Sequence, residues 1–255
     1  MKKQLGKHVI YFIIAAALAF LIVIPILTVF LEAVTVNGRL DFSNAVQVIW
    51  NSSNLHTIGN SLLLGILVVI TSTLIATPLA FILVRTRFSR KKWLDIIFMI
   101  PFMTPPYISS MGWILFMQKR GLFQQMFPWT GSFSEGFFSL GGLTMAMSLH
   151  VFPFMTTILK NAMLNINGSL EESGAVFGGS FWYRLRRITM PLLTGNYAIG
   201  MLLVFVKTLS EYGTPATLGK RIGFYVFTTD IHRYATTAPI DFGKASSLSS
   251  VLIGI

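Results

Sequence analysis

Long apolar runs, separated by short polar and basic stretches, dominate the chain. A helix needs about 20 mostly apolar residues to cross a bilayer. Five runs approach or exceed that length, and a sixth opens near Ala245 and reaches the last residue, Ile255. The runs cover residues 9–31, 57–84, 96–117, 143–159, 197–210 and 245–255. This pattern predicts an all-α, polytopic bundle of about six transmembrane helices, and we expect the polypeptide to continue beyond the incomplete sixth.

The first run follows a short segment that carries Lys2, Lys3 and Lys7. A secretory signal peptide begins in the same way, but this run is longer than the apolar region of such a peptide, and no small-residue cleavage site follows it. We therefore expect an uncleaved anchor. The chain then divides into an anchor span with an outer loop, residues 1–56, and the core of the bundle, residues 57–255. For the last run, a short buried or interfacial helix is the alternative.

Prolines and small residues recur inside the runs. Proline lacks a backbone donor and kinks a helix, which membrane bundles tolerate where neighbouring groups satisfy the freed carbonyl. Small and hydroxyl residues let helices approach closely. The prolines are Pro25, Pro78, Pro101, Pro105, Pro106 and Pro153, and the small residues include Gly59, Ser61, Gly65, Ser72, Ser109, Ser110 and Gly112. Both features favour a packed bundle over separate anchors.

Composition supports a membrane protein. Of the residues, 53% are hydrophobic and 11% are charged, whereas about a quarter of an ordinary soluble domain is charged. The formal net charge of +11 would suggest nucleic-acid binding in a soluble protein. Here the cations lie between apolar runs, so they mark the sides of a membrane, and no nucleic-acid partner is expected.

The basic residues alternate in density from one connection to the next. Twelve of the 20 Lys and Arg residues lie in the amino-terminal segment and in the connections at residues 85–92 and 160–191. Seven lie in the alternate connections, and Lys207 lies inside a run. Because Lys and Arg are enriched on the cytoplasmic side of membrane proteins, the first set predicts a cytoplasmic amino terminus. The densest cluster consists of Arg85, Arg87, Arg90, Lys91 and Lys92.

One cytoplasmic connection, residues 165–191, is too polar to cross the membrane and too long for a tight turn. Its sequence predicts two short helices around a glycine hinge. Ser169 is the expected N-cap of the first helix, with Glu172 three residues later at capping-box spacing. The glycine pair at 178–179 then allows a sharp turn. The second helix is expected to end near Pro191, where the next span begins.

The same segment carries a family resemblance. Bacterial ABC importer permeases have a cytoplasmic signature of Glu-Ala-Ala, three residues, Gly, nine residues and Ile-x-Leu-Pro. This chain resembles it without a gap, and it departs from it by small-for-small and apolar-for-apolar changes at Ser173, Gly174 and Met190. The resemblance implies that residues 165–191, the coupling segment, form the helix that docks on the cytoplasmic ATPase. The residues assigned to coupling are Glu171, Glu172, Ser173, Gly174, Gly178, Ile188 and Pro191.

Other stretches are similar to the same superfamily. They are Asn60-Ser61-Leu62, Pro78-Leu79-Ala80, Arg85-Thr86-Arg87, residues 101–106, and residues 209–215 with Leu218-Gly219. The 209–215 stretch most specifically resembles the ferric-iron importer permeases, which are often one long chain of two homologous halves. The resemblance implies a type I ABC importer permease fold and the amino-terminal half of such a fused protein.

A function follows from this resemblance: a permease subunit of an ATP-driven importer in the bacterial inner membrane. Ferric iron is the expected cargo, and polyamine, phosphonate, thiamine or sulfate are the alternatives. The implied partners are a cytoplasmic ATPase dimer, a periplasmic or lipid-anchored solute-binding protein, a second permease half and membrane lipid. An ion-coupled secondary transporter and a structural or assembly membrane protein are alternatives from other classes. Neither of these needs a glycine-hinged double helix that docks an ATPase.

The chain has no catalytic motif of its own. A phosphate-binding loop of the Gly, four residues, Gly-Lys-Ser/Thr type is absent. There is no Cys, and the four His residues lack metal-site spacing. We therefore expect no catalytic residue, no metal site and no bound cofactor in this chain, and we expect a partner ATPase to use ATP and Mg. The histidines His8, His56, His150 and His232 are expected to be structural or interfacial.

Charged residues also occur within and beside the spans. Lys207 lies inside the fifth run with Glu211 four residues later, so on a helix the two would share a face. Because ionisable groups in a membrane usually face a bundle interior or an aqueous path, we assign both, with Asn60 and Ser61, to the translocation path. A structural ion pair near the outer interface is the alternative. Asp95 is expected to neutralise the neighbouring basic cluster.

The long outer connection, residues 212–244, is rich in aromatic and charged side chains. Such a surface suits the docking of an extracytoplasmic binding protein. It suits an aromatic belt at the membrane interface equally well.

Overall fold

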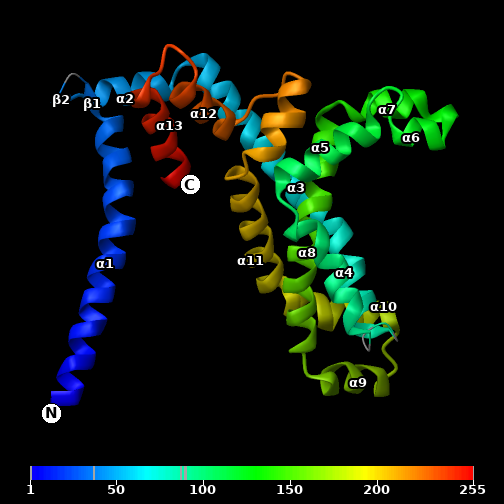
Figure 1. The fold of residues 1–255 in the computed structure, drawn as a ribbon. Coiled ribbons are helices and arrows are strands. Elements are labelled where there is room, and N and C mark those ends of the chain that lie inside the picture. Colours follow the sequence, from blue (N-terminus) through cyan, green and yellow to red (C-terminus); the bar gives the residue numbers. More distant parts are fainter. Residues whose placement is uncertain (1, 37, 87, 89–90, 255) are drawn as a thin grey trace. The chain divides into compact units, whose positions relative to one another are not determined.

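A computed structural model describes residues 2–36, 38–86, 88 and 91–254 (Figure 1). Contacts divide the chain into two compact units, which we describe separately: Met1–Ile58 with Phe227–Ile255, the first unit, and Gly59–Val226, the second unit. The predicted division at residue 56 differs from this grouping, because residues 227–255 pack with the amino-terminal segment. Arg87, Arg90 and Ile255 lie outside the described residues.

The first unit is built on a long amino-terminal helix. Its elements are α1 (Lys2–Ala33), β1 (Thr35–Val36), β2 (Arg39–Leu40), α2 (Phe42–Ile49), the start of α3 (Ser52–Arg85), α12 (Phe227–Thr236) and α13 (Phe242–Gly254). The two short strands pair antiparallel, with Thr35 opposite Leu40. Helix α13 packs against α1, α2 and α12, and the Ser247 hydroxyl donates to the Ala33 carbonyl at 3.2 Å. A small core forms around Val48, Phe227 and Leu248.

The second unit is a helix bundle around α8 (Figure 1). Its elements are the rest of α3, α4 (Lys92–Met103), α5 (Pro106–Met117), α6 (Leu122–Met126), η2 (Pro128–Thr130), α7 (Gly131–Phe137), α8 (Leu140–Leu164), α9 (Gly168–Val176), α10 (Phe181–Arg184), η3 (Leu185–Thr189), α11 (Met190–Leu209) and η4 (Pro215–Gly219). Helix α8 contacts α4, α5, α7, α11 and η4. It is therefore the most buried of the long helices, with 72% of its apolar window inside.

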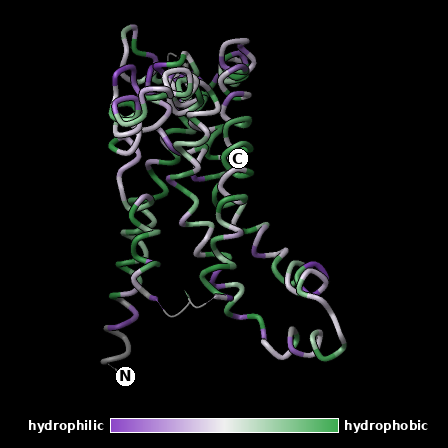
Figure 2. Tube along the Cα trace, turned by 90° about the vertical axis from the view of Figure 1, so that its right-hand side faces the viewer, coloured by the Kyte–Doolittle hydropathy of each residue, from purple (hydrophilic) through white to green (hydrophobic). Residues whose placement is uncertain are grey.

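Within the part of the chain that the structure describes, four helices are long and apolar enough to cross a membrane, which confirms the prediction of an all-α membrane bundle apart from the two short strands. They are Ile10–Ala33, Ser52–Arg85, Leu140–Leu164 and Phe181–Leu209, and Trp93–Met103 is a shorter apolar helix. Figure 2 shows hydrophobic residues along these helices. Much of this apolar surface is exposed, which suits a lipid environment.

The third predicted span is broken in two. Helix α4 ends at Met103, and Thr104 is extended with ψ of 133°. Pro105 follows, and α5 restarts with Pro106 in its first turn. A residue that precedes proline is pushed out of the helical region, and proline itself suits a helix start. The Thr104-Pro105-Pro106 sequence thus makes a break where the apolar pattern alone predicts one helix.

The fifth predicted span is longer than the apolar run suggested. Helix α10, the π-helical turn η3 and α11 follow without interruption, giving a 29-residue helix from Phe181 to Leu209. The two arginines at 186 and 187 lie in this π turn and end the apolar run without ending the helix. A π turn directly before Pro191 fits the backbone donor that proline lacks.

Some of the small residues predicted at helix contacts lie there. A Cβ on Gly65 would lie 2.6 Å from the Phe205 ring, so α3 and α11 approach closely. Ser61, Ser72 and Ser110 are buried. Gly59 and Gly112 have nothing within 4 Å of such a Cβ, so they are not contact positions in this unit. Gly200 is a contact position that was not predicted, since a Cβ on it would lie 2.6 Å from the Met155 sulfur.

Candidate functional site

The coupling segment, residues 165–191, forms one end of the second unit, which we call the α9 end (Figure 1). Helix α9 begins one residue before the predicted cap. Asn167 is the N-cap, and its side chain accepts from the Ser169 backbone N–H at 3.1 Å. The prediction that Ser169 caps the helix is therefore wrong. Asn caps a helix as well as Ser does, and Asn167 lies only two residues before Ser169.

The glycine hinge lies where it was predicted. Gly178 has a φ of +78°, which L-residues with a side chain rarely adopt. The Gly179 N–H donates to the Gly174 carbonyl at 2.9 Å, across the end of α9. Ser180 then caps α10, because its hydroxyl accepts from the Tyr183 N–H at 3.3 Å. The chain thus reverses within about three residues.

The hinge brings separated signature residues together. A Cβ on Gly174 would lie 2.7 Å from the Ile188 side chain and 3.3 Å from that of Arg184. A small residue at position 174 therefore lets α9 lie against η3. Glu171, Glu172 and Ser173 lie on α9, and Pro191 lies in the first turn of α11.

Large apolar side chains are exposed at the tip of this segment. Phe177 is 90% exposed and Val176 is 83% exposed. Residues Gly174 and Phe177 through Ser180, with Tyr183, line a groove of about 580 Å³. The signature predicted the hinge but gave no indication of this apolar tip, since single exposed apolar residues carry no pattern.

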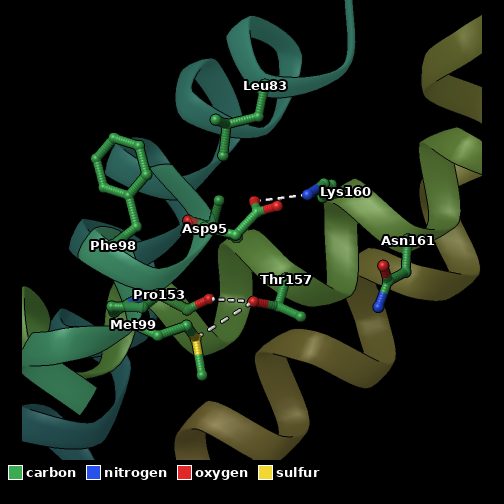
Figure 3. A pocket seen from close by; sticks show the side chains of 9 residues that line it. Leu83, Asp95, Phe98, Met99, Pro153, Thr157, Lys160 and Asn161 are labelled. Atoms are coloured by element: carbon green, nitrogen blue, oxygen red, sulfur yellow. Dashed lines mark hydrogen bonds and ion pairs between the residues drawn. The ribbon is translucent and has the colours of Figure 1, made fainter. Parts of the chain in front are cut away.

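Basic residues of two connections converge at the α9 end. Arg85 and Arg184 line one cavity there. Lys160 Nζ lies 2.5 Å from Asp95 Oδ1 and joins α8 to α4 beside a cavity of about 270 Å³ (Figure 3). Asp95 therefore pairs across helices, whereas it was predicted to neutralise the 85–92 cluster, of which Arg87, Arg90 and the Lys92 side chain lie outside the described residues. The sequence pattern could not indicate this partner, because 65 residues separate Asp95 from Lys160.

A further cavity lies at the carboxyl-terminal end of α11. It has a volume of about 530 Å³, and it is lined by Pro105, Pro106, Tyr107, Lys207, Ser210, Glu211, Tyr212 and Gly213. Helix α11 ends at Leu209, before Glu211. The prediction that Lys207 and Glu211 share a helical face is therefore wrong, although both line the same cavity.

The charged groups of this cavity are held by specific contacts. Lys207 Nζ lies 5.1 Å from the centre of the Phe102 ring, a favourable cation–π geometry. The Glu211 carboxylate accepts from the Thr214 N–H at 3.1 Å and from the Thr214 hydroxyl. A Cβ on Gly213 would lie 2.8 Å from the Tyr107 nitrogen, so the backbone of this loop touches the start of α5.

The other two residues assigned to the path, Asn60 and Ser61, lie away from this cavity, on α3. The Asn60 side chain donates to the Tyr225 carbonyl at 2.9 Å, and Ser61 is buried. Neither lines the cavity of Lys207 and Glu211. The structure therefore brings together two of the four.

A partly buried aromatic stack that the sequence did not reveal lies beside Lys207. The Phe102 ring stacks on His150 at 6.1 Å and on Phe154 at 5.4 Å. His150 is 3% exposed, as expected of a structural histidine. Among the described residues, no group of three or more His, Cys, Asp or Glu side chains lies close enough to hold a metal ion.

Comparison with known proteins shows which family the chain resembles. The family model of the "binding-protein-dependent transport system inner membrane component" matches residues 72–253. The chain is 29% identical over 252 residues to the ferric transport system permease protein FbpB of Actinobacillus pleuropneumoniae. It has the same identity to FbpB 1 of Haemophilus influenzae, whose assignment to ferric transport is provisional. These matches cover 95% of this chain but 36% and 39% of the relatives' lengths.

Permeases named for other cargo are also similar. The molybdenum transport system permease protein ModB of Escherichia coli K12 is 28% identical over 145 residues, covering 56% of this chain and 62% of that protein. Permeases named for sulfate transport match as well. The chain therefore resembles permeases of several cargo classes.

A solved structure shares the fold. A bacterial alginate ABC transporter, crystallised with an alginate pentasaccharide-bound periplasmic protein, superposes with a TM-score of 0.75 at 18% identity. The match covers 98% of this chain and 92% of the transporter chain, so the type I permease fold was predicted correctly. The chain belongs to the family of binding-protein-dependent transport system inner membrane components, the multi-pass membrane permeases of ABC importers.

Proposed function

We propose that the chain works as the permease subunit of an ATP-driven importer, by alternating access coupled to a partner ATPase. The observation that carries the proposal is the uninterrupted helix from Phe181 to Leu209. It joins the hinged coupling segment at one end to the cavity of Lys207 and Glu211 at the other. Movement of the segment would thus be passed rigidly to the cavity.

The ATPase would dock on the exposed tip of α9. Val176 and Phe177 offer apolar anchors of the kind that fills a groove on a partner. Gly174 lets α9 press against Ile188, so a pull on α9 acts directly on η3. Glu171, Glu172, Ser173, Gly178 and Pro191 complete this coupling unit. The ATPase dimer, and not this chain, would use ATP and Mg.

Docking can be tested by co-purification with the ATPase encoded beside the permease gene. Phe177→Asp places a charge at the apolar tip, and we expect it to abolish binding, because burying an unpaired carboxylate is costly. Asn165→Asp adds the same charge at an exposed position near α9 and should leave binding intact. If Phe177→Asp binds as well as the unchanged protein, the assignment of this tip to the ATPase is wrong.

The translocation path would pass Lys207 and Glu211, with Asn60 and Ser61 on α3 further along it. Charged groups facing a cavity of about 530 Å³ in a membrane protein usually mark such a path. We propose that the α9 end is cytoplasmic, because Lys and Arg gather in its connections, and the Lys residues of the amino-terminal segment support the same orientation for the amino terminus. The outer connection, residues 212–244, would then receive the extracytoplasmic binding protein, and a second permease half would complete the path.

Ferric iron is the cargo that we propose, because it is the cargo in the names of the two similar FbpB proteins. Molybdate and sulfate are the alternatives that similar permeases favour, and polyamine, phosphonate and thiamine stay open. Cells that lack other iron importers should accumulate radioactive iron only when this permease, its ATPase and its binding protein are present. Accumulation of molybdate or sulfate in place of iron would reassign the cargo and leave the permease function intact.

A further inference from the structure

The connection between α5 and α8, residues 122–137, is folded and tied to the bundle by aromatic rings. We call it the outer aromatic segment. It contains α6, η2 and α7 and lies at the end of the second unit opposite α9 (Figure 1). The Phe123 ring lies 5.5 Å from Phe116 of α5. The Trp113 ring of α5 lies 5.7 Å from Phe137. These contacts fix the segment against α5, so its outward face is a fixed surface.

That outward face is apolar and aromatic. Trp129 is 80% exposed, Met126 63%, Leu122 59% and Phe133 56%. These four exposed side chains fall within residues 122–133, and this much exposed apolar surface in water would mark an interaction site. Polar residues border it: Lys119 and Arg120 at its start and Glu135 near its end are exposed.

We infer that this face lies in the headgroup and upper acyl region of the membrane and anchors the outer end of the bundle to lipid. Helices of five and seven residues are too short to cross a bilayer but can lie in its interface. Tryptophan is enriched at that depth, since its ring is apolar and its N–H is polar. Lys119 and Arg120, which are exposed just before the segment, can pair with lipid phosphates.

Continuity with the lipid-facing surface selects lipid over a protein partner. On α5 the apolar side chains of Ile108 and Leu115 are exposed at 61% and 56%, and α5 leads into the segment after only four residues. Exposed apolar side chains therefore lie on α5, a helix of the membrane bundle, and again on α6, separated by the four-residue connection that carries Lys119 and Arg120.

The depth of this face can be measured by site-directed spin labelling. The chain contains no cysteine, so Trp129→Cys, Phe133→Cys and Glu135→Cys each give one labelling site in it. Collision of the nitroxide with oxygen reports lipid, and collision with an aqueous nickel chelate reports water. In vesicles that contain the permease, we expect a several-fold higher ratio of oxygen to nickel accessibility at positions 129 and 133 than at 135. Position 135 lies on the same helix as 133 and is the matched control.

Two outcomes overturn the inference. Greater nickel than oxygen accessibility at positions 129 and 133 would place the face in water, available to a soluble protein. Low accessibility to both reagents would mean that another polypeptide covers it. If Trp129→Cys does not yield folded protein, Met126→Cys reports the same face from α6.

Discussion

Gly174 sits where α9 comes closest to η3, and the size of its side chain sets that approach. A methyl group there would meet the end of the Ile188 side chain at 2.7 Å and the Arg184 side chain at 3.3 Å, and both are flexible side chains that can move. We expect Gly174→Ala to be tolerated and Gly174→Leu to cost about 1–3 kcal/mol, because overpacking forces the helices apart. Thermal unfolding of the purified variants measures the cost. Gly174→Leu combined with Ile188→Ala should recover part of it, and no recovery would mean that this contact does not limit side-chain size.

Asp241, just before α13, makes stability depend on pH. Its pKa is lowered, first because the carboxylate accepts the Lys244 backbone N–H and second because of the Lys244 ammonium. A lowered pKa adds stability above the ordinary value of 3.8, and this stability is lost as pH falls through the lower folded pKa. Asp241→Asn keeps a capping side chain but does not titrate. The difference in melting temperature between the two proteins should therefore shrink below about pH 4.

Melting curves of both proteins between neutral and acidic pH test this. A difference that stays constant with pH would show that Asp241 does not titrate differently in the folded state.

At the scale of elements, the Asp95–Lys160 pair joins α4 to α8 (Figure 3). Both side chains are partly exposed, so the pair should contribute no more than about 1 kcal/mol. Asp95→Asn leaves Lys160 without its partner, and Lys160→Met removes the charge. We expect each single change to lower stability slightly and the double change to be less harmful than their sum. A double-mutant cycle on unfolding measures this coupling, and strict additivity would contradict it.

The elements also show what could be predicted from the sequence. The apolar runs placed the long helices, and the gap-free signature placed the Gly178 hinge, because both depend on local pattern. The break at Thr104–Pro105 and the extension of α11 back to Phe181 were missed. Prolines at 101, 105 and 106 predicted a kink but not its position. The arginines at 186 and 187 ended the apolar run, so the sequence did not indicate that the helix continues through a π turn.

At the scale of the site, residues far apart in the chain were the ones that pattern could not place. The stack of Phe102 on His150 and the pairing of Asp95 with Lys160 both depend on packing between helices. Lys207 and Glu211 were paired by an assumed helix, yet a loop brings them to one cavity. The two residues do line the same cavity, as predicted, but they do not share a helical face, because α11 ends at Leu209.

At the scale of the whole molecule, one long helix runs from the coupling segment, with its exposed apolar tip, to a charged cavity. The most direct measurement is cargo uptake into vesicles that contain the permease, its ATPase and its binding protein, with ion gradients collapsed by ionophores. We predict uptake that needs ATP on the side of the ATPase and that Phe177→Asp abolishes while Asn165→Asp does not. Uptake that proceeds without ATP and follows an imposed ion gradient would contradict the account and favour a secondary transporter.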